Sequence, residues 1–188
     1  MTANLPNLLT WLRISLIPLF VGVFYVPEQW LSASVRDSAA TAIFVVAAAT
    51  DWLDGWLARR LNQTSAFGAF LDPVADKLMV AAALVVLLHL DRVDAIVALV
   101  IIGREIGVSA LREWMAKAGQ ARSVAVATIG KVKTASQMVA IPLLLYGEPL
   151  PGLPDSQWLG TILIHVAAVL TVVSMLYYLR KAIPEAVH

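Results

Sequence analysis

Four aspartates with helical spacing are the residues of this sequence most able to do chemistry. Asp51 and Asp54 are three positions apart, and Asp72 and Asp76 are four positions apart. At about 100° per residue, the first pair lies about 60° apart around a helix and the second about 40° apart, so each pair shares one helix face. Carboxylate oxygens suit hard divalent cations such as Mg²⁺ or Mn²⁺. Four carboxylates are enough to bridge two such ions, an arrangement suited to in-line displacement at phosphorus.

The residues around these acids favour a phosphate-containing ligand. Ordinary ion pairing between helices is the alternative, but Lys77 and Arg59 cannot together neutralise four carboxylates. Gly55 and Gly68 remove a side chain beside the acids, which predicts room for a bulky group; close helix packing is the alternative for the glycines alone. Arg59 lies four residues after Gly55, hence on nearly the same face, and can offer two donors to a phosphate.

The composition indicates a membrane protein. The chain has 188 residues, of which 60% are hydrophobic and 14% charged, whereas about a quarter of a soluble domain is charged. Backbone polar groups in lipid must pair internally, so segments of about 20 apolar residues are read as membrane-spanning helices. Six segments qualify, at residues 8–26, 38–59, 67–90, 94–114, 127–147 and 157–179. We therefore predict an all-α, polytopic membrane protein with six transmembrane helices and one domain over residues 1–188.

The second and third predicted helices should position the aspartates. A short loop joins them into an antiparallel hairpin, so the two aspartate pairs lie near corresponding ends and can face each other at similar depth. A charge at the bilayer centre is costly, which makes intramembrane acids functional candidates. Three further acids occur where helix N-caps are expected: Asp37, Asp94 and Asp155.

The distribution of lysine and arginine predicts the orientation. The first and third loops hold only Arg36 and Arg92. The even-numbered loops, their flanks and the C-terminal tail hold Arg59, Arg60, Arg112, Lys117, Arg122, Lys131, Lys133, Arg180 and Lys181. Positive loops face the cytoplasm, so both termini and the aspartates are predicted on that side. The net charge of +1 gives no reason to expect a nucleic-acid partner, and the absence of cysteine excludes disulfides and thiolate metal sites.

The stretch DWLDGWLARRLNQTSAFGAFLDPVADK resembles the signature of the CDP-alcohol phosphotransferase family, D-x2-D-G-x2-A-R-x8-G-x3-D-x3-D. Every fixed position is filled with every gap intact, by Asp51, Asp54, Gly55, Ala58, Arg59, Gly68, Asp72 and Asp76. The six predicted spans and cytoplasmic termini also match the architecture of that family. The resemblance implies that the protein moves a phosphatidyl group from CDP-diacylglycerol to an alcohol and releases CMP.

The resemblance also implies roles for particular residues. The four aspartates would hold two divalent cations, and Asp76 would act as the base. Three more stretches, NLPNLLTWLRISLIPLF, GREIGVSALREWMA and IGKVKTASQMVA, resemble bacterial members that use glycerol 3-phosphate, and they extend the likeness over most of the chain. A homodimer in the inner (cytoplasmic) membrane is implied as well. Contacts to CDP-diacylglycerol would come from Gly55, Arg59, Ser65, Gly68, Asn7 and Thr10, with Arg13 near the nucleotide or the membrane surface.

An anionic acceptor such as glycerol 3-phosphate needs a basic pocket near the metals. Arg104 is the most informative candidate because it lies inside the fourth predicted helix, with Glu105 beside it as a possible partner. Arg112, Lys131 and Lys133 are the other candidates, at the same cytoplasmic level. Lys117 and Arg122 fit the positive-inside pattern alone, and the sixth predicted helix carries no recognisable chemistry.

Two other functions are consistent with intramembrane acids. One is a sister enzyme of the same family that forms cardiolipin or uses inositol phosphate. The other is a divalent cation transporter with acids along its pathway. Against transport, the four aspartates cluster toward one membrane face, and the second half of the chain offers no matching repeat of the kind found in transporters.

Overall fold

The computed structural model is built from long helices and describes residues 5–61, 66–117, 128–149 and 155–186. These ranges contain no strand, and one short 3₁₀ turn, η1 (Val23–Tyr25), follows the first helix. The all-α prediction is therefore confirmed, and each predicted segment overlaps one α-helix. The helices are α1 (Leu5–Gly22), α2 (Ala33–Leu61), α3 (Ala66–His89), α4 (Ala95–Lys117), α5 (Thr128–Tyr146) and α6 (Ser156–Ala186).

The predicted N-caps are confirmed at two positions and wrong at the third. A carboxylate oxygen of Asp94 accepts a hydrogen bond from the Ile96 backbone N–H at 2.7 Å, and Asp155 accepts one from the Gln157 N–H at 3.0 Å. These bonds satisfy helix N–H groups that lack an intrahelical partner. Asp37 instead lies inside α2, because that helix begins at Ala33, five residues before the predicted segment.

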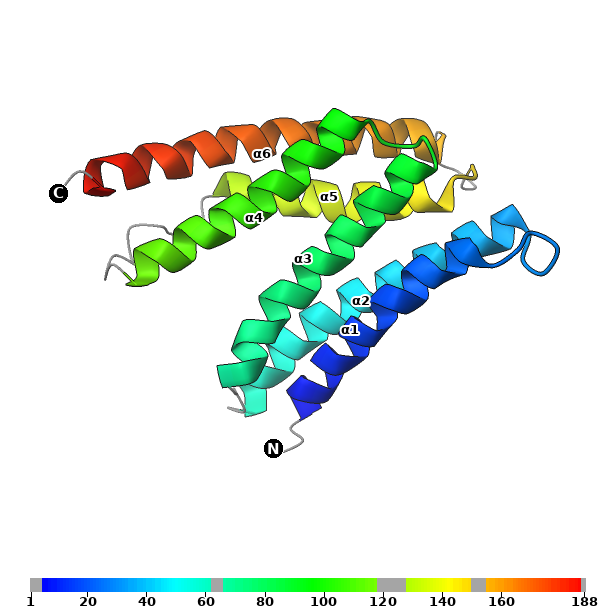
Figure 1. Cartoon of the computed structure of the whole chain (residues 1–188), viewed down its shortest axis with the longest axis horizontal. Coiled ribbons are helices and arrows are strands. Elements are labelled where there is room, and N and C mark those ends of the chain that lie inside the picture. Colours follow the sequence, from blue (N-terminus) through cyan, green and yellow to red (C-terminus); the bar gives the residue numbers. More distant parts are fainter. Residues whose placement is uncertain (1–4, 62–65, 118–127, 150–154, 187–188) are drawn as a thin grey trace.

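The helices form two arms that meet at one end (Figure 1). α1, α2 and α3 make one arm, while α4, α5 and α6 make the other, with α3 reaching up to α4. Successive helices run in alternating directions. We call the end with the α1–α2, α3–α4 and α5–α6 connections the closed end. The opposite, open end holds both termini, and there α2 and α4 finish and α3 and α5 begin.

Buried apolar side chains gather in the half of the molecule near the closed end. Phe20 from the end of α1, Phe44 from the first half of α2 and Leu84 from the second half of α3 belong to this core. α5 and α6 approach closely there, because a Cβ on Gly160 would lie 2.8 Å from Cγ of Leu144. The core therefore fixes the arms at one end and leaves the open half to polar groups.

A partly buried arginine in the α3–α4 connection ties α2 to α5 at the closed end. The Arg92 guanidinium donates to the backbone carbonyls of Leu144 at 3.1 Å and Leu145 at 2.8 Å, and it pairs with the Asp37 carboxylate. Gly147 has φ +70, and a Cβ there would lie 2.9 Å from the guanidinium. Both the backbone conformation and the available space therefore require glycine at this position. The pairing with Arg92 explains why Asp37 is buried rather than capping a helix.

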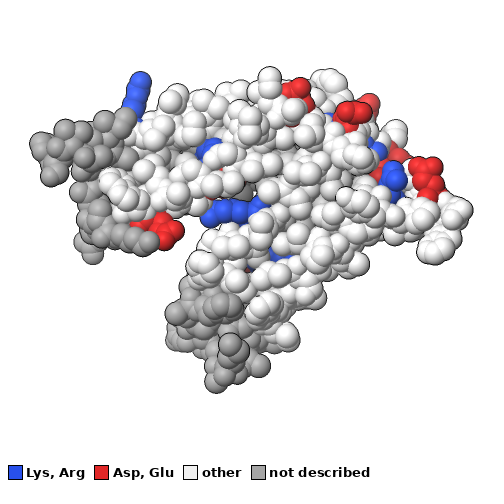
Figure 2. Space-filling model, in the orientation of Figure 1, with Lys and Arg blue, Asp and Glu red and all other residues white. Residues whose placement is uncertain are grey.

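Much of the surface is apolar, as expected of a membrane protein. Side chains such as Val46, Val85, Leu99 and Val169 are exposed on four different helices. Figure 2 shows a face that is largely free of charged side chains; most of those visible lie at the closed end and in the hollow between the arms, and a few lie at the opposite end. Within the described residues, two stretches are long and apolar enough to cross a membrane, Leu8–Tyr25 and Ser156–Arg180. α2 to α5 carry the acids and bases of the predicted site, which lower their hydropathy, so six spans remain a prediction.

Candidate active site

The first helix supplies partners to two of the motif aspartates. Nη1 of Arg13 lies 2.8 Å from a carboxylate oxygen of Asp51, and the Thr10 hydroxyl donates a hydrogen bond of 2.5 Å to Asp72. Arg13 and Thr10 are both buried. The base at Arg13 was missing from the sequence-based charge balance, which counted Lys77 and Arg59. A signal was present, because two polar residues three positions apart share one face of a mostly apolar helix.

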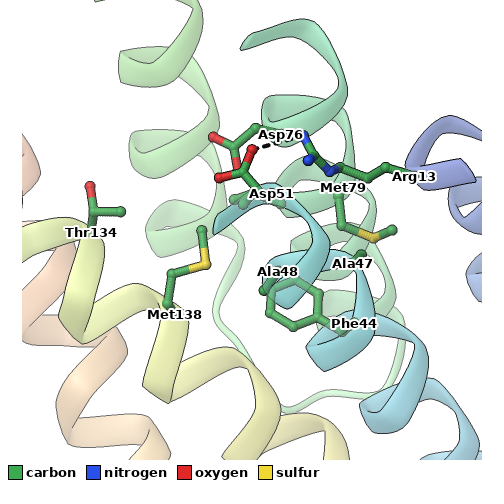
Figure 3. A pocket seen from close by; sticks show the side chains of 10 residues that line it. Arg13, Phe44, Ala47, Ala48, Asp51, Asp76, Met79, Thr134 and Met138 are labelled. Atoms are coloured by element: carbon green, nitrogen blue, oxygen red, sulfur yellow. Dashed lines mark ion pairs between the residues drawn. The ribbon is translucent and has the colours of Figure 1, made fainter. Parts of the chain in front are cut away.

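Asp51 and Asp76 line a cavity of about 290 Å³ between α1, α2, α3 and α5, which we call the acidic cavity. Figure 3 shows the two carboxylates close together, one from α2 and one from α3, with Arg13 reaching Asp51 from α1. Most of the remaining lining is apolar and includes Phe44 and Met138. Such a cavity suits a ligand that has a charged or cation-binding group at one end and an apolar remainder.

A second cavity, of about 410 Å³, lies between α3, α4 and α5, and we call it the basic cavity. Arg104 and Lys133 line it, together with Lys77, Asp76 and Glu105. Asp76 and Thr134 line both cavities, so the two spaces adjoin at these side chains. The structure thus brings one predicted metal ligand next to two predicted acceptor contacts.

Asp76 differs from Asp51 and Asp72 in having no hydrogen-bond or ion-pair partner within the described part of the chain. Among the described residues, none donates a hydrogen bond to its carboxylate or forms an ion pair with it. The side chain is only partly buried, and it faces both cavities. Its oxygens are therefore available to a cation or to a hydroxyl group of a substrate.

The bases of the basic cavity have an acidic partner. Lys133 is 2% exposed and forms an ion pair with Glu105. Nη1 of Arg104 lies 3.7 Å from the same carboxylate, so the predicted pairing of Glu105 with Arg104 is present but shared. Two bases against one acid leave a local excess of positive charge, which favours an anionic ligand.

The sixth helix, in which the sequence shows no recognisable chemistry, contacts a base that lines this cavity. Nη2 of Arg104 donates to the Ser174 hydroxyl at 3.1 Å, and the Arg104 guanidinium carbon lies 5.8 Å from the centre of the Tyr178 ring. Ser174 and Tyr178 are both buried. Sequence reasoning missed them because serine and tyrosine on an apolar helix commonly serve packing alone.

The other predicted residues are less fully described. Gly68 is buried on α3, and Lys131 is exposed on α5 and lines neither cavity. Ser65 lies outside the described residues. The helices include the backbones of five more, whose side chains lie outside the described part of the chain: Asn7, Asp54, Gly55, Arg59 and Arg112.

The donor set is compatible with a hard divalent cation. Asp51 and Asp76 offer carboxylate oxygens to one cavity, and Asp72 lies one turn before Asp76 on α3. The described side chains contain no group of three or more acids or histidines arranged to hold a metal. Because the Asp54 side chain is outside that description, the four-aspartate metal site stays a prediction.

Comparison with known proteins identifies related chains. The model of the CDP-alcohol phosphatidyltransferase family matches residues 3–173. The chain is 52% identical, over 97% of its length and 96% of theirs, to proteins of Escherichia coli (strain K12) and Shigella flexneri serotype 5b named CDP-diacylglycerol–glycerol-3-phosphate 3-phosphatidyltransferase. A Pseudomonas fluorescens protein of the same name is also 52% identical, over 97% of this chain and 91% of its own.

Proposed function

This chain belongs to the CDP-alcohol phosphatidyltransferase family, and we propose that it transfers the phosphatidyl group of CDP-diacylglycerol to glycerol 3-phosphate, giving phosphatidylglycerophosphate and CMP. The observation that carries the proposal is the position of Asp76, which lines both the acidic and the basic cavity. A reaction between two substrates needs one group that can reach both. The names of near-full-length relatives support this donor and this acceptor.

The donor occupies the acidic cavity in this proposal. Asp51, Asp54, Asp72 and Asp76 would hold two divalent cations, Mg²⁺ or Mn²⁺, which would supply positive charge to neutralise the donor pyrophosphate. Thr10 and Arg13 keep Asp72 and Asp51 oriented. The donor itself is contacted by Asn7, Gly55, Arg59, Ser65 and Gly68, and Thr10 acts on it through Asp72.

Asp76 acts as the general base. Its carboxylate takes the proton of an acceptor hydroxyl, and the freed oxygen forms a bond to the phosphorus that carries the diacylglycerol. The bond from that phosphorus to the CMP oxygen breaks, and CMP leaves with the electron pair. The open approach to Asp76 from the basic cavity supports this role.

The acceptor phosphate binds in the basic cavity, where Arg104 and Lys133 face it. The cavity lining includes three bases, Lys77, Arg104 and Lys133, and two acids, Asp76 and Glu105, so the balance is 3 − 2 = +1. A dianionic phosphate is attracted by such an excess. Arg112 is a further proposed contact, on the same helix as Arg104.

The membrane arrangement is also proposed. All six helices cross the inner membrane, with both termini and the site at the cytoplasmic face, where the open half of the molecule admits soluble glycerol 3-phosphate. The arginines at the other face, Arg36 and Arg92, lie beside the Asp37 carboxylate, which offsets their charge. Two copies form a homodimer, as the family resemblance implies.

The acceptor assignment is tested by CMP release from purified protein in mixed micelles of detergent and CDP-diacylglycerol with Mg²⁺. Glycerol 3-phosphate, inositol phosphate, serine and phosphatidylglycerol are supplied separately, with EDTA as the metal-free control. We expect release with glycerol 3-phosphate alone and its loss with EDTA. Release with another alcohol would contradict the acceptor assignment but would still support phosphatidyl transfer. Folded protein that releases no CMP with any acceptor would contradict both.

A further inference from the structure

The hydrogen bonds around Ser174 have a fixed direction. A serine hydroxyl has one proton, and Ser174 donates it to the backbone carbonyl of Thr171 at 2.9 Å. Its oxygen must therefore accept the bond from Nη2 of Arg104, at 3.1 Å. Ser174 is 1% exposed, so water does not compete for this geometry. The backbone of α6 thus sets the direction in which Arg104 donates.

The Tyr178 ring adds a second constraint on Arg104. The guanidinium carbon lies 5.8 Å from the ring centre, within the range of a cation–π interaction. Tyr178 is one turn beyond Ser174 on α6 and is itself packed edge-on against Tyr177, with ring centres 5.9 Å apart. The ring is buried, so its position is set by packing.

The partners of Arg104 differ from that of Lys133. Lys133 is held by the carboxylate of Glu105, which cancels much of its charge. Arg104 shares that carboxylate at 3.7 Å, and its other two partners, a hydroxyl and an aromatic ring, orient the cation without neutralising it. An arginine oriented in this way keeps its charge and its remaining donors for an anion.

We propose that Ser174 and Tyr178 are positioning residues for Arg104, and that α6 thereby sets the affinity of the basic cavity for the acceptor phosphate. The inference rests on the proposed function, because it takes glycerol 3-phosphate as the ligand of Arg104. Neither residue touches the reacting atoms, so their effect is on acceptor binding rather than on the donor.

The test measures KM for both substrates in Ser174→Ala. Removing the acceptor of a charged hydrogen bond is expected to raise KM for glycerol 3-phosphate about tenfold. KM for CDP-diacylglycerol should stay unchanged, which a general loss of structure would not allow. The matched control is Ser15→Ala, because the Ser15 hydroxyl bonds a carbonyl of its own helix, Trp11 O at 3.0 Å, and serves no arginine. An unchanged KM for glycerol 3-phosphate in Ser174→Ala would overturn the inference.

A double-mutant cycle with Arg104→Met separates this inference from the proposed function. If Ser174 acts through Arg104, Ser174→Ala has no further effect on KM in the Arg104→Met background. A further tenfold rise there would contradict the positioning role. If Arg104→Met alone leaves KM for glycerol 3-phosphate unchanged, the acceptor phosphate does not bind at Arg104 and the proposed acceptor site is wrong.

Two substitutions of Tyr178 test the role of the ring. They also test the inference if Ser174→Ala folds poorly. Tyr178→Phe keeps the aromatic face under Arg104 and should keep KM for glycerol 3-phosphate within about threefold. Tyr178→Leu removes the face and should raise that KM about fivefold or more. Equal values in the two variants would contradict a role for the ring.

Discussion

The partner of each charged residue decides how much of its charge is left for a ligand. Asp72 accepts a hydrogen bond from the neutral hydroxyl of Thr10, which fixes the carboxylate and leaves its negative charge in place. Asp51 pairs with the guanidinium of Arg13, so its charge is largely balanced before any cation binds. The first helix therefore leaves more negative charge on Asp72 than on Asp51. Asp72 should attract a divalent cation more strongly.

The bond from Thr10 can be removed with little change of shape. Thr10→Val deletes the hydroxyl, and we expect the rate of CMP release to fall about tenfold, with more Mg²⁺ needed for half-maximal rate, because Asp72 is no longer oriented. Thr10→Ser keeps the donor and should recover most of the rate. A valine variant with the wild-type rate and Mg²⁺ dependence would show that this bond has no part in the reaction.

The two lysines at the start of α5 should differ in effect. Lys133→Met removes a base from the basic cavity and leaves Glu105 without its partner, so KM for glycerol 3-phosphate should rise at least about tenfold. Lys131→Met changes an exposed lysine that lines neither cavity and should alter that KM less than about threefold. Steady-state kinetics with CDP-diacylglycerol held constant gives both values, and the opposite order would contradict the assigned cavity.

The spacing of the motif predicted that acids from two helices meet, and Asp51 and Asp76 do line one cavity. It could not predict Thr10 or Ser174 as partners, because a hydroxyl on an apolar helix gives the same pattern whether it bonds its own backbone or another helix. Only the packing of α1 and α6 decides which occurs.

The positions of the core and of the site follow from the same pattern of helices. Buried apolar side chains gather near the closed end, and the acids and bases of the candidate site lie in the open half, where the arms diverge. Rigid packing at one end can hold polar groups apart at the other. Arg92 contributes to this rigidity because it joins the start of α2 to the end of α5.

The Arg92 network should matter for stability and not for chemistry. Arg92→Met leaves two carbonyls without their donor and the buried Asp37 carboxylate with the more distant Arg36, at 3.7 Å, and should lower the free energy of unfolding by about 2–4 kcal/mol. Adding Asp37→Leu removes the stranded charge and should recover part of that loss. Thermal unfolding in detergent measures both. Equal melting temperatures for wild type and Arg92→Met would show that the network contributes nothing.

The six helical segments were predictable because hydropathy and loop residues mark them directly. The start of α2 was not, because residues 33–37 are polar enough to be read as a loop. A long-range ion pair to Arg92 makes it favourable to bury Asp37 within the helix. Such a pair between residues far apart in sequence leaves no local signal.

The whole molecule has two chemically different ends, and this difference is the basis of the proposed orientation in the membrane. Successive helices alternate in direction, so both termini lie at the open end with the site (Figure 1). The proposed orientation places this end in the cytoplasm, where the positive residues of the even-numbered connections are expected.

The absence of cysteine makes this orientation simple to test with single introduced thiols. Glu28→Cys lies in the α1–α2 connection at the closed end, and Glu113→Cys lies near the end of α4 at the open end. A membrane-impermeant maleimide should label the first in spheroplasts and the second only in inverted vesicles. The reverse result would invert the orientation, and labelling of both from one side would contradict the alternation of the helices across the membrane.

In the proposed mechanism, Asp76 acts on both substrates because it lies between the two cavities. The most direct measurement is CMP release by Asp76→Asn with CDP-diacylglycerol and glycerol 3-phosphate. The matched control is Asp91→Asn, an exposed aspartate with φ 55 at the closed end, a backbone conformation that asparagine also adopts. We predict a fall of about 10²- to 10⁴-fold in Asp76→Asn and no fall in the control. A folded Asp76→Asn protein that releases CMP within tenfold of the wild-type rate would contradict the account.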